Sequence, residues 1–189
     1  MKNEEITFLL NECLAGKKKS FEPITSFFKD KIYRMCYRIL GTPQDAEDAT
    51  MDVFIKAYNS LNSYNPQYAF STWLFKIAIN HSIQILRRQK VETDFIFNQS
   101  LNPAISVHTQ SPETIYLNYY KQDALSSAIE NLPVKYRTAL MLKYQEDLSY
   151  EQIGEILDIP VNTVGSLILR GKKELKEILG KSDFLTNNN

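Results

Sequence analysis

Apolar residues recur at intervals of three and four along most of the chain, and no alternating apolar and polar run persists. This spacing is typical of amphipathic helices rather than strands. Gly and Pro stand where the period restarts, as expected at helix ends. The pattern predicts helices over residues 4–15, 21–40, 43–61, 71–89, 112–131, 133–145, 149–157 and 161–179.

Residues that can cap helices stand at several of these starts. Thr42 precedes a proline and has Asp45 three residues further on, which is close to a capping box. Ser111 also precedes a proline, and Ser149 can cap the helix that follows it. These local signals support the predicted helix starts.

The helical period fails between residues 90 and 111, where Asn, Ser, Thr, Gln and Pro are frequent. A stretch of about twenty residues without structure is too long for an ordinary loop in a compact domain. We therefore predict an all-α fold of two small helical domains, residues 1–91 and 113–181, joined by a flexible linker over 92–112. Residues 182–189 end in three Asn and are expected to form a disordered tail.

A helix-turn-helix is predicted over the segment EQIGEILDIPVNTVGSLILR, residues 151–170. Gly154 lies where two helices would cross closely, and Asp158 lies at the turn, where a left-handed backbone is usually needed. In such motifs the second helix enters the major groove of DNA. Its polar stripe contains side chains suited to phosphates and base edges: Asn162, Thr163, Ser166, Arg170 and Lys173. An ordinary helical hairpin with a solvated face is the alternative.

Three acids share one face of the helix at 43–61, namely Asp45, Asp48 and Asp52. Compensation of the helix dipole would explain Asp45 and Asp48, because acids favour the first turn. It does not explain Asp52, which lies too far from the first turn of this helix. From this helix alone, a partner surface and a solvated face remain equally open.

The helix at 71–89 carries Trp73, Lys76, Asn80, Gln84 and Arg87 along one side. An aromatic ring, two amides and two cations on one stripe suit unstacked bases and phosphates. The preceding loop, residues 61–70, is rich in Asn, Ser and Tyr and could hold a flipped base. For Trp73 a place in the core is equally open, and His81 is expected to be a buried core residue rather than a ligand.

Composition narrows the function further. The 189 residues are 43% hydrophobic and 23% charged, as in ordinary soluble proteins. No apolar run approaches the ~20 residues of a membrane helix, and the first residues lack a secretion signal. Cys13 and Cys36 have no metal-binding spacing and fit reduced core thiols. We expect a cytoplasmic protein with no metal and no cofactor.

The charge balance indicates a partner. The chain has 22 Lys and Arg, 22 Asp and Glu, and no net charge, yet residues 170–181 hold a local basic cluster. Such a chain is expected to bind DNA weakly alone. A partner would have to supply the rest of the affinity.

The segments RILGTPQDAEDATMDVFIKAY and FSTWLFKIAINHSIQILRR resemble region two of the extracytoplasmic-function (ECF) sigma factors. LPVKYRTALMLKYQEDLSYEQIGEILDIPVNTVGSLILRGKKELKEIL resembles region four of the same family. The resemblance covers about residues 7–90 and 113–180, in the family's order. It implies a subunit that binds core RNA polymerase and directs initiation at promoters, without being an enzyme.

The resemblance also implies roles for particular residues. The acidic helix would dock on the clamp helices of core polymerase through Asp45, Asp48, Asp52 and Phe54. Recognition and melting of the minus-ten element would involve the loop at 62–70 and the helix after it, with candidates Asn62, Tyr64, Trp73, Lys76, Asn80, Gln84, Arg87 and Arg88. The stripe of the helix-turn-helix would read the minus-thirty-five element. The implied partners are core RNA polymerase, promoter DNA and an anti-sigma factor, with no small-molecule substrate, in a monomer or a one-to-one heterocomplex.

The chain departs from the family in region four. Family members often carry a basic residue at the position of Gly165 and Arg at that of Leu167, so minus-thirty-five contacts are expected to be weak or unusual. Gly165 also costs about 1 kcal/mol of helix stability relative to Ala. Gly154 stands in place of the usual Ala, which is expected to be a mild change.

Two other classes of function fit the sequence less well. A stand-alone helix-turn-helix regulator predicts tight duplex binding without polymerase and a dimer, but leaves the acidic and Trp73 stripes without purpose. An all-helical enzyme is disfavoured, because the sequence shows no nucleophile–base pair and no Gly-rich phosphate loop.

Overall fold

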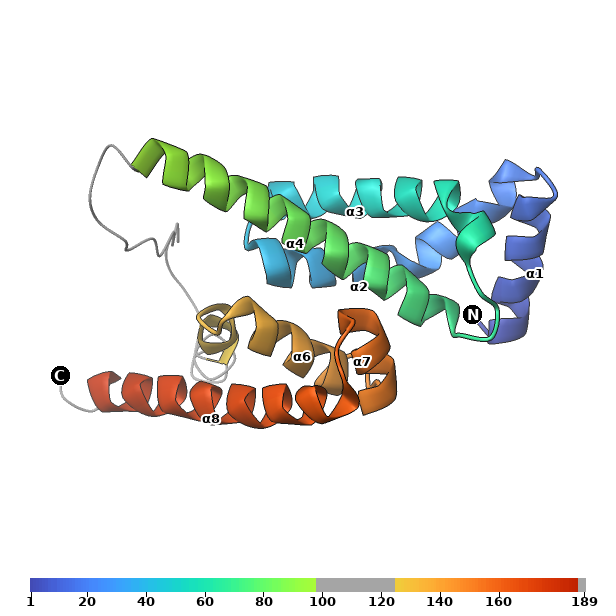
Figure 1. The fold of residues 1–189 in the computed structure, drawn as a ribbon. Helices are drawn as coiled ribbons and strands as arrows, with labels where there is room; N and C mark the ends of the chain where they lie inside the picture. The colour runs from blue at the N-terminus through green and yellow to red at the C-terminus, as the bar shows by residue number, and fades with distance from the viewer. Residues whose placement is uncertain (98–124, 187–189) are drawn as a thin grey trace.

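The computed structural model describes residues 1–97 and 125–186, with side chains over 1–89 and 125–180. Within these ranges every regular element is a helix, which confirms the predicted all-α fold (Figure 1). Most of the expected linker and the first part of the helix expected at 112–131 lie outside the described residues. No helix in the described ranges is long and apolar enough to cross a membrane.

The first half is built on three helices that pack against one another: α2 (Glu22–Leu40), α3 (Pro43–Asn59) and α4 (Phe70–Phe97). α1 (Asn3–Leu14) and the 3-10 turn η1 (Lys18–Phe21) close one end, and the turn η2 (Leu61–Ser63) leads into the loop before α4. The apolar stripes predicted from the sequence meet in one core, which contains Ile32, Val53 and Leu74 fully buried. Burial of each such side chain contributes about 1.5–3 kcal/mol. Cys13 and Cys36 are free and buried in this core, as expected.

The second half contains a short helix over residues 125–130, followed by α6 (Val134–Tyr144), α7 (Tyr150–Leu157) and α8 (Val161–Thr186). α8 packs against both α6 and α7. Gly171 allows the close approach of α6, because a Cβ at this position would lie 3.2 Å from Leu140 Cδ1 and Tyr136 Cβ. The core of this half includes Leu142, fully buried.

The two predicted caps that the structure describes are present. Thr42 Oγ1 accepts a hydrogen bond from the Asp45 backbone N–H at 3.3 Å at the start of α3. Ser149 and Gln152 form a full capping box at the start of α7, with bonds of 3.2 and 2.9 Å. Both caps satisfy amide groups that a helix leaves unpaired in its first turn.

Two helices are longer than the sequence pattern predicted. α4 continues to Phe97, into the range expected to be linker, and α8 continues to Thr186, so residues 182–186 are helical rather than part of a disordered tail. Beyond residue 91 the extension of α4 contains neither Gly nor Pro, and α8 continues through Gly180. A helix that is already nucleated extends at little cost, and one Gly in its interior costs only about 1 kcal/mol relative to Ala. By contrast, α3 ends at Asn59, two residues early, and the chain turns into η2.

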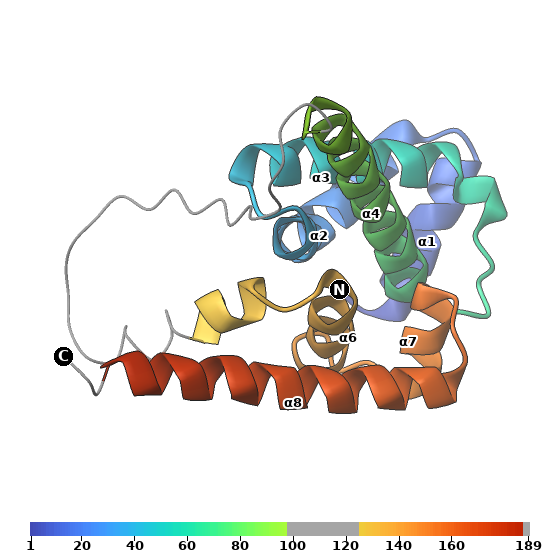
Figure 2. The same ribbon diagram turned by 60° about the vertical axis from the view of Figure 1, so that its left-hand side comes forward.

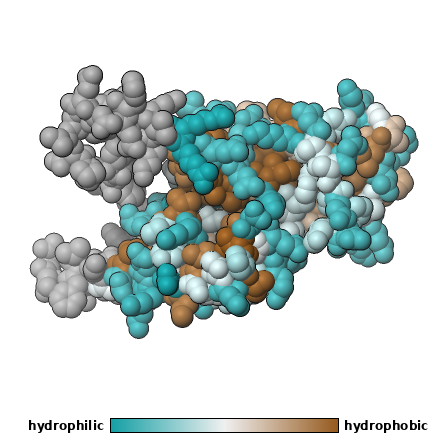
Figure 3. Space-filling model, viewed as in Figure 1, coloured by the Kyte–Doolittle hydropathy of each residue, from teal (hydrophilic) through white to brown (hydrophobic). Residues whose placement is uncertain are grey.

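The two halves lie against each other, α4 beside α7 and α2 beside α6 (Figures 1 and 2). Apolar side chains gather along this seam (Figure 3). Lys31 Nζ of α2 donates to Glu146 Oε2 at 3.1 Å across it. The buried Arg137 donates to the carbonyl of Ile39 at 3.5 Å and to that of Glu130 at 2.8 Å.

Candidate nucleic-acid interface

The three acids predicted on one face of α3 differ in their surroundings. Asp45 is half-buried, and its Oδ2 accepts from Thr42 Oγ1 at 2.7 Å and from Gln89 Nε2 at 3.2 Å. Asp52 Oδ2 accepts from His81 Nε2 at 3.1 Å. Asp48 is exposed and has no polar partner among the described side chains. Asp48 is therefore the acid of this face whose carboxylate is fully available to a partner.

Phe54 does not belong to this face. It is only 8% exposed and lies in the core, because the buried stripe of α3 is wide enough to include it beside Val53. The apolar residues exposed on α3 are instead Met51 and Ile55, at 59% and 58%. The sequence contained a signal for them, since they follow Asp48 and Asp52 by three residues and so share their side of the helix.

A pocket of about 410 Å³ lies where the loop before α4 meets the start of that helix. Its wall on this side combines hydroxyl, amide, aromatic and cationic groups from Ser63, Asn65, Tyr68, Thr72, Trp73 and Lys76. Thr72 Oγ1 is buried and has no hydrogen-bond partner among the described residues. The pattern of the sequence identified Trp73 and Lys76 but missed Thr72, whose position only the folded loop makes part of the wall.

Trp73 is half-buried, so it is neither a fully buried core residue nor a fully exposed one. Its ring lies 5.4 Å from that of Tyr64 and 5.5 Å from that of Phe70, in tilted contacts. The rest of the ring lines the pocket. Tyr64 supports the loop, since its hydroxyl donates to the Tyr68 carbonyl at 2.7 Å and burial raises the pKa of that phenol.

The remaining candidates on α4 are more dispersed. Asn80, Gln84, Arg87 and Arg88 are exposed, as is Asn62 on η2, and none of them lines the pocket. Arg87 lies instead on a groove of about 390 Å³ at the seam, whose other walls include Leu86, Val134 and Leu167. The structure therefore brings Trp73 and Lys76 together and leaves the other cations and amides spread along the helix.

α7 and α8 form the predicted helix-turn-helix. Asp158 ends α7 in the left-handed conformation, with φ 56° and ψ 47°. A Cβ on Gly154 would lie 2.9 Å from the carbonyl oxygen of Ile159, which is closer than side-chain carbons approach backbone. The expectation that Ala would be a mild replacement here is therefore wrong, because the turn passes directly over this position.

The stripe of α8 is exposed and outward-facing. A shallow groove of about 340 Å³ joins Asn162, Thr163, Ser166, Leu167 and Arg170. Lys173 lies one turn further on and pairs with Glu177 at 4.0 Å. The basic residue next to it, Lys172, was not a candidate. It lies 4.8 Å from the centre of the Tyr144 ring, whose hydroxyl raises its pKa.

Leu167 explains one departure from the family pattern. This residue is half-buried and lines the seam groove together with Ile83 and Leu86 of α4. An apolar side chain there buries surface between the two halves, where a guanidinium would lose hydration. Gly165 has a different setting, since a Cβ there would meet only Tyr150 at an ordinary 3.6 Å.

The packing of the two halves covers one candidate surface and leaves another open. Glu155 and Asp158 of the second half form the far wall of the pocket that contains Trp73 and Lys76. The residues of the α8 stripe are exposed, and α8 runs along the edge of the second half in Figure 2. Two acidic residues therefore line the same pocket as Trp73 and Lys76.

In the described ranges no three His, Cys, Asp or Glu side chains are grouped so that they could hold a metal ion. His81 is buried, as expected, and contacts Asp52 and Lys56.

Comparison with known proteins agrees with the two halves. Residues 28–92 match the family described as Sigma-70 region 2, and residues 122–175 match Sigma-70, region 4. The ECF RNA polymerase sigma factor SigW of Bacillus subtilis is 36% identical over 170 residues, covering 87% of this chain and 91% of SigW. The ECF RNA polymerase sigma-E factor of Haemophilus influenzae is 32% identical, covering 89% of this chain and 92% of that protein.

Solved structures share the fold. CnrH, determined with the cytosolic domain of CnrY, superimposes with a TM-score of 0.68 at 17% identity, covering 95% of this chain and 99% of CnrH. The sigma factor RpoE of Bartonella quintana, determined with the anti-sigma factor NepR, gives 0.67 at 20% identity, covering 86% and 98%. The relatives are polymerase subunits, so a stand-alone regulator is not favoured. The chain belongs to the ECF sigma factors, which bind core RNA polymerase and direct promoter-specific initiation of transcription.

Proposed function

We propose that this sigma factor performs initiation through three separate surfaces. The face of α3 around Asp48, Met51 and Ile55 docks on core polymerase. The pocket around Trp73 and Lys76 takes up one unstacked base of the minus-ten element, and the outward stripe of α8 contacts the minus-thirty-five element. In this assignment residues 1–91 and 113–181 act as the two functional domains, with 92–112 between them.

One observation carries the proposal for strand capture: a single pocket is lined by Trp73 and Lys76 of α4 together with polar side chains of the loop that precedes this helix. Stacking of a base on an aromatic ring contributes about 1–3 kcal/mol. Opening a promoter costs on the order of 1.4 kcal/mol for each stacked step. Captured bases therefore offset part of that cost, and contacts with core polymerase must supply the remainder. We infer a binding protein without covalent chemistry of its own.

We also propose where this protein acts and how its activity is regulated. Transcription takes place in the bacterial cytoplasm, so the protein would act there. Because the similar sigma factor RpoE was determined with an anti-sigma factor, we propose that an anti-sigma factor also restrains this chain.

Multi-round transcription tests the function. Sigma-free bacterial core polymerase is supplied with the full chain and a library of genomic promoter fragments, and specific transcripts are sequenced. Transcripts that depend on the protein would support the proposal and deliver the promoter motif. Absence of both core binding and initiation would overturn it.

Variants in the same assay test the surfaces. Trp73→Leu should lower initiation from duplex promoters more than from templates with a premelted minus-ten element, because those templates need less stacking energy. Tyr58→Leu is the matched control, since Tyr58 is a half-buried aromatic residue that contacts Phe21 away from the pocket.

Asp48→Lys should weaken core binding, whereas Asp30→Lys, which changes an exposed acid on α2, should not. If a test variant and its control change the measured quantity equally, the tested residue does not have the role proposed for it.

A further inference from the structure

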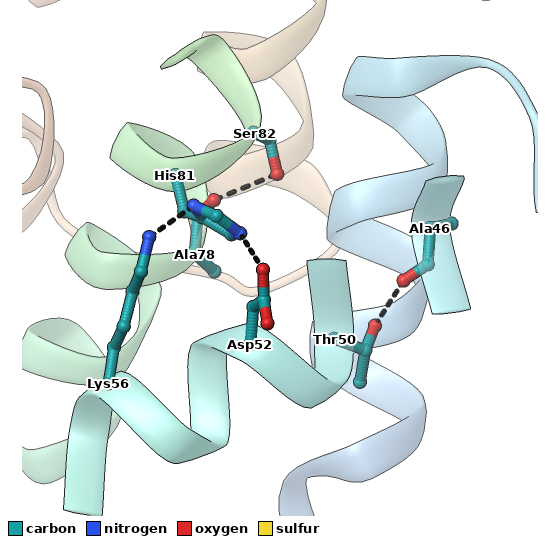
Figure 4. A network of polar contacts seen from close by, with 7 residues as sticks. All are labelled: Ala46, Thr50, Asp52, Lys56, Ala78, His81 and Ser82. Atoms are coloured by element: carbon teal, nitrogen blue, oxygen red, sulfur yellow. Dashed lines mark hydrogen bonds and ion pairs between the residues drawn. The ribbon is translucent and has the colours of Figure 1, made fainter. Parts of the chain in front are cut away.

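His81 of α4 lies between two charged side chains of α3 (Figure 4). Its Nε2 is 3.1 Å from Asp52 Oδ2, and its Nδ1 is 2.5 Å from Lys56 Nζ. The imidazole side chain is 8% exposed, whereas that of Asp52 is 56% exposed. One buried ring therefore connects a surface carboxylate of the proposed docking face to α4.

The two partners decide where the proton of the ring lies. A Lys ammonium can only donate, so Nδ1 must accept through its lone pair. Nε2 then carries the proton and donates it to the Asp52 carboxylate. Burial, followed by the charge of Lys56, holds the pKa of His81 below its usual value, against the opposing effect of Asp52. Arg88 is the other charged group near the ring and acts in the same direction as Lys56. The imidazole that connects Asp52 and Lys56 is therefore neutral.

The ring keeps two opposite charges apart. Asp52 and Lys56 are one helical turn apart on α3, which is the spacing at which an acid and a base pair directly on a helix surface. In the structure each of them is bound to a different nitrogen of His81 instead. Without the ring, the ammonium would be free to swing onto the carboxylate and neutralise it. A neutralised Asp52 would attract a cationic partner less strongly.

We propose that His81 is a positioning residue for docking on core polymerase: it keeps Lys56 away from Asp52 and holds the carboxylate ready for a cationic side chain of the partner. The proposal rests on the docking role proposed above for this face of α3. The partner surface would have to carry basic side chains opposite Asp48 and Asp52 and apolar side chains opposite Met51 and Ile55. His81 itself is buried and belongs to α4, whereas the docking face lies on α3.

The test measures the affinity of full-length variants for sigma-free bacterial core polymerase at pH 7.5. His81→Leu keeps an apolar side chain in the buried site and removes both nitrogens. It should weaken binding by up to about fivefold, the scale of one exposed charge contact. His81→Gln should retain most of the affinity, because its amide can donate to Asp52. Ser82→Ala is the matched control, since the neighbouring Ser82 is buried and bonds within its own helix to the Ala78 carbonyl.

A second substitution separates positioning from packing. Adding Lys56→Gln to His81→Leu should restore core affinity, because no ammonium remains to pair with Asp52. Thermal unfolding of each variant, followed by circular dichroism, shows whether the fold is retained. A loss of affinity in His81→Leu that Lys56→Gln does not restore would assign the effect to packing and overturn the proposal.

Failure of the docking face itself gives a different result. Normal affinity of His81→Leu beside weakened binding of Asp48→Lys would overturn only the role of His81. Normal affinity of both variants would overturn the docking face, and the role of His81 with it. Weak binding of His81→Leu with restoration by Lys56→Gln supports both.

Discussion

An added Cβ would have opposite effects at two glycines of the helix-turn-helix, Gly154 and Gly165. At Gly154 the carbonyl of Ile159 occupies the space where a Cβ would lie, at 2.9 Å. At Gly165 the corresponding space is open, with Tyr150 at 3.6 Å. Gly154 leaves room for the turn to pass close to α7, whereas Gly165 only costs the helix backbone entropy.

Paired alanine substitutions should therefore move the stability in opposite directions. Gly154→Ala should lower the free energy of unfolding by about 1–3 kcal/mol, the range for overpacking. Gly165→Ala should raise it by about 1 kcal/mol through helix propensity. Urea unfolding of the full chain, followed by circular dichroism, measures both changes. A loss of stability of the same size at both positions would contradict the different surroundings of the two glycines.

His81 predicts a dependence of stability on pH. Its pKa in the folded chain lies below the 6.5 of an ordinary His, mainly because of burial. Between these two values the unfolded chain binds more protons, so the free energy of unfolding falls as the pH drops from 6.5 toward the folded pKa. Above 6.5 the contribution of the neutral ring is fully present.

His81→Gln removes that titration and provides the comparison. The stability difference between the natural chain and His81→Gln should narrow between pH 7.5 and pH 5.5, as measured by urea unfolding at each pH. Groups common to both chains cancel in the difference. A difference that stays constant would mean that folding does not shift the pKa of His81.

At the scale of elements, α8 has one face in the core and another, the proposed DNA-contacting stripe, exposed to solvent. Val164 and Ile168 face the core, while Ser166 and Arg170 face outward. The Ser166 hydroxyl bonds to the Asn162 carbonyl at 3.1 Å, so part of its polarity is used within the helix. Arg170 is exposed and carries the positive charge of the stripe between Ser166 and Lys173, so we expect it to contribute most to the proposed contact with DNA.

Arg170→Ala should weaken the upstream promoter contact by ~1–3 kcal/mol, the range for loss of one specific side-chain contact. The measurement is footprinting of the minus-thirty-five element by the polymerase complex. Lys172→Ala is the matched control on the same helix, because Lys172 lies over the Tyr144 ring and away from the stripe. Full protection of the upstream element by Arg170→Ala would remove this residue from the DNA contact.

At the scale of the whole molecule, the seam decides which surface is open. α7 covers the Trp73 pocket with Glu155 and Asp158, and the stripe of α8 remains outside. The ion pair between Lys31 and Glu146 crosses the seam, and the carboxylate of that pair is buried. A buried carboxylate that loses its cation has lost the contact that compensates its desolvation.

Lys31→Glu should therefore open the seam. The expected results are a larger radius of gyration in small-angle scattering and stronger binding of single-stranded oligonucleotides by the free chain, because the pocket becomes accessible. The charge swap Lys31→Glu with Glu146→Lys should bring both quantities back toward those of the natural chain. An unchanged scattering profile of Lys31→Glu would show that this pair does not hold the halves together.

Sequence reasoning reached further for the elements than for the surfaces. The helices around Ile32, Val53 and Ile153 were predictable because their apolar positions repeat within a few residues. The left-handed turn at Asp158 was predictable for the same local reason. The burial of Phe54, which the resemblance had suggested as a docking residue, was not predictable, and Thr72 was missed, because the width of a core stripe and the path of a loop depend on what packs against them.

The sequence alone determined that the chain is helical, where most helices begin, which segments resemble sigma regions two and four, and which polar stripes could meet DNA or polymerase. These properties depend on contacts between residues three or four apart, which any local stretch of sequence contains. Only the tertiary structure decided that His81 separates Asp52 from Lys56, that Leu167 fills the seam and that the acids of α7 close the Trp73 pocket. Each of these contacts joins residues far apart in the chain, so it exists only after the helices have packed.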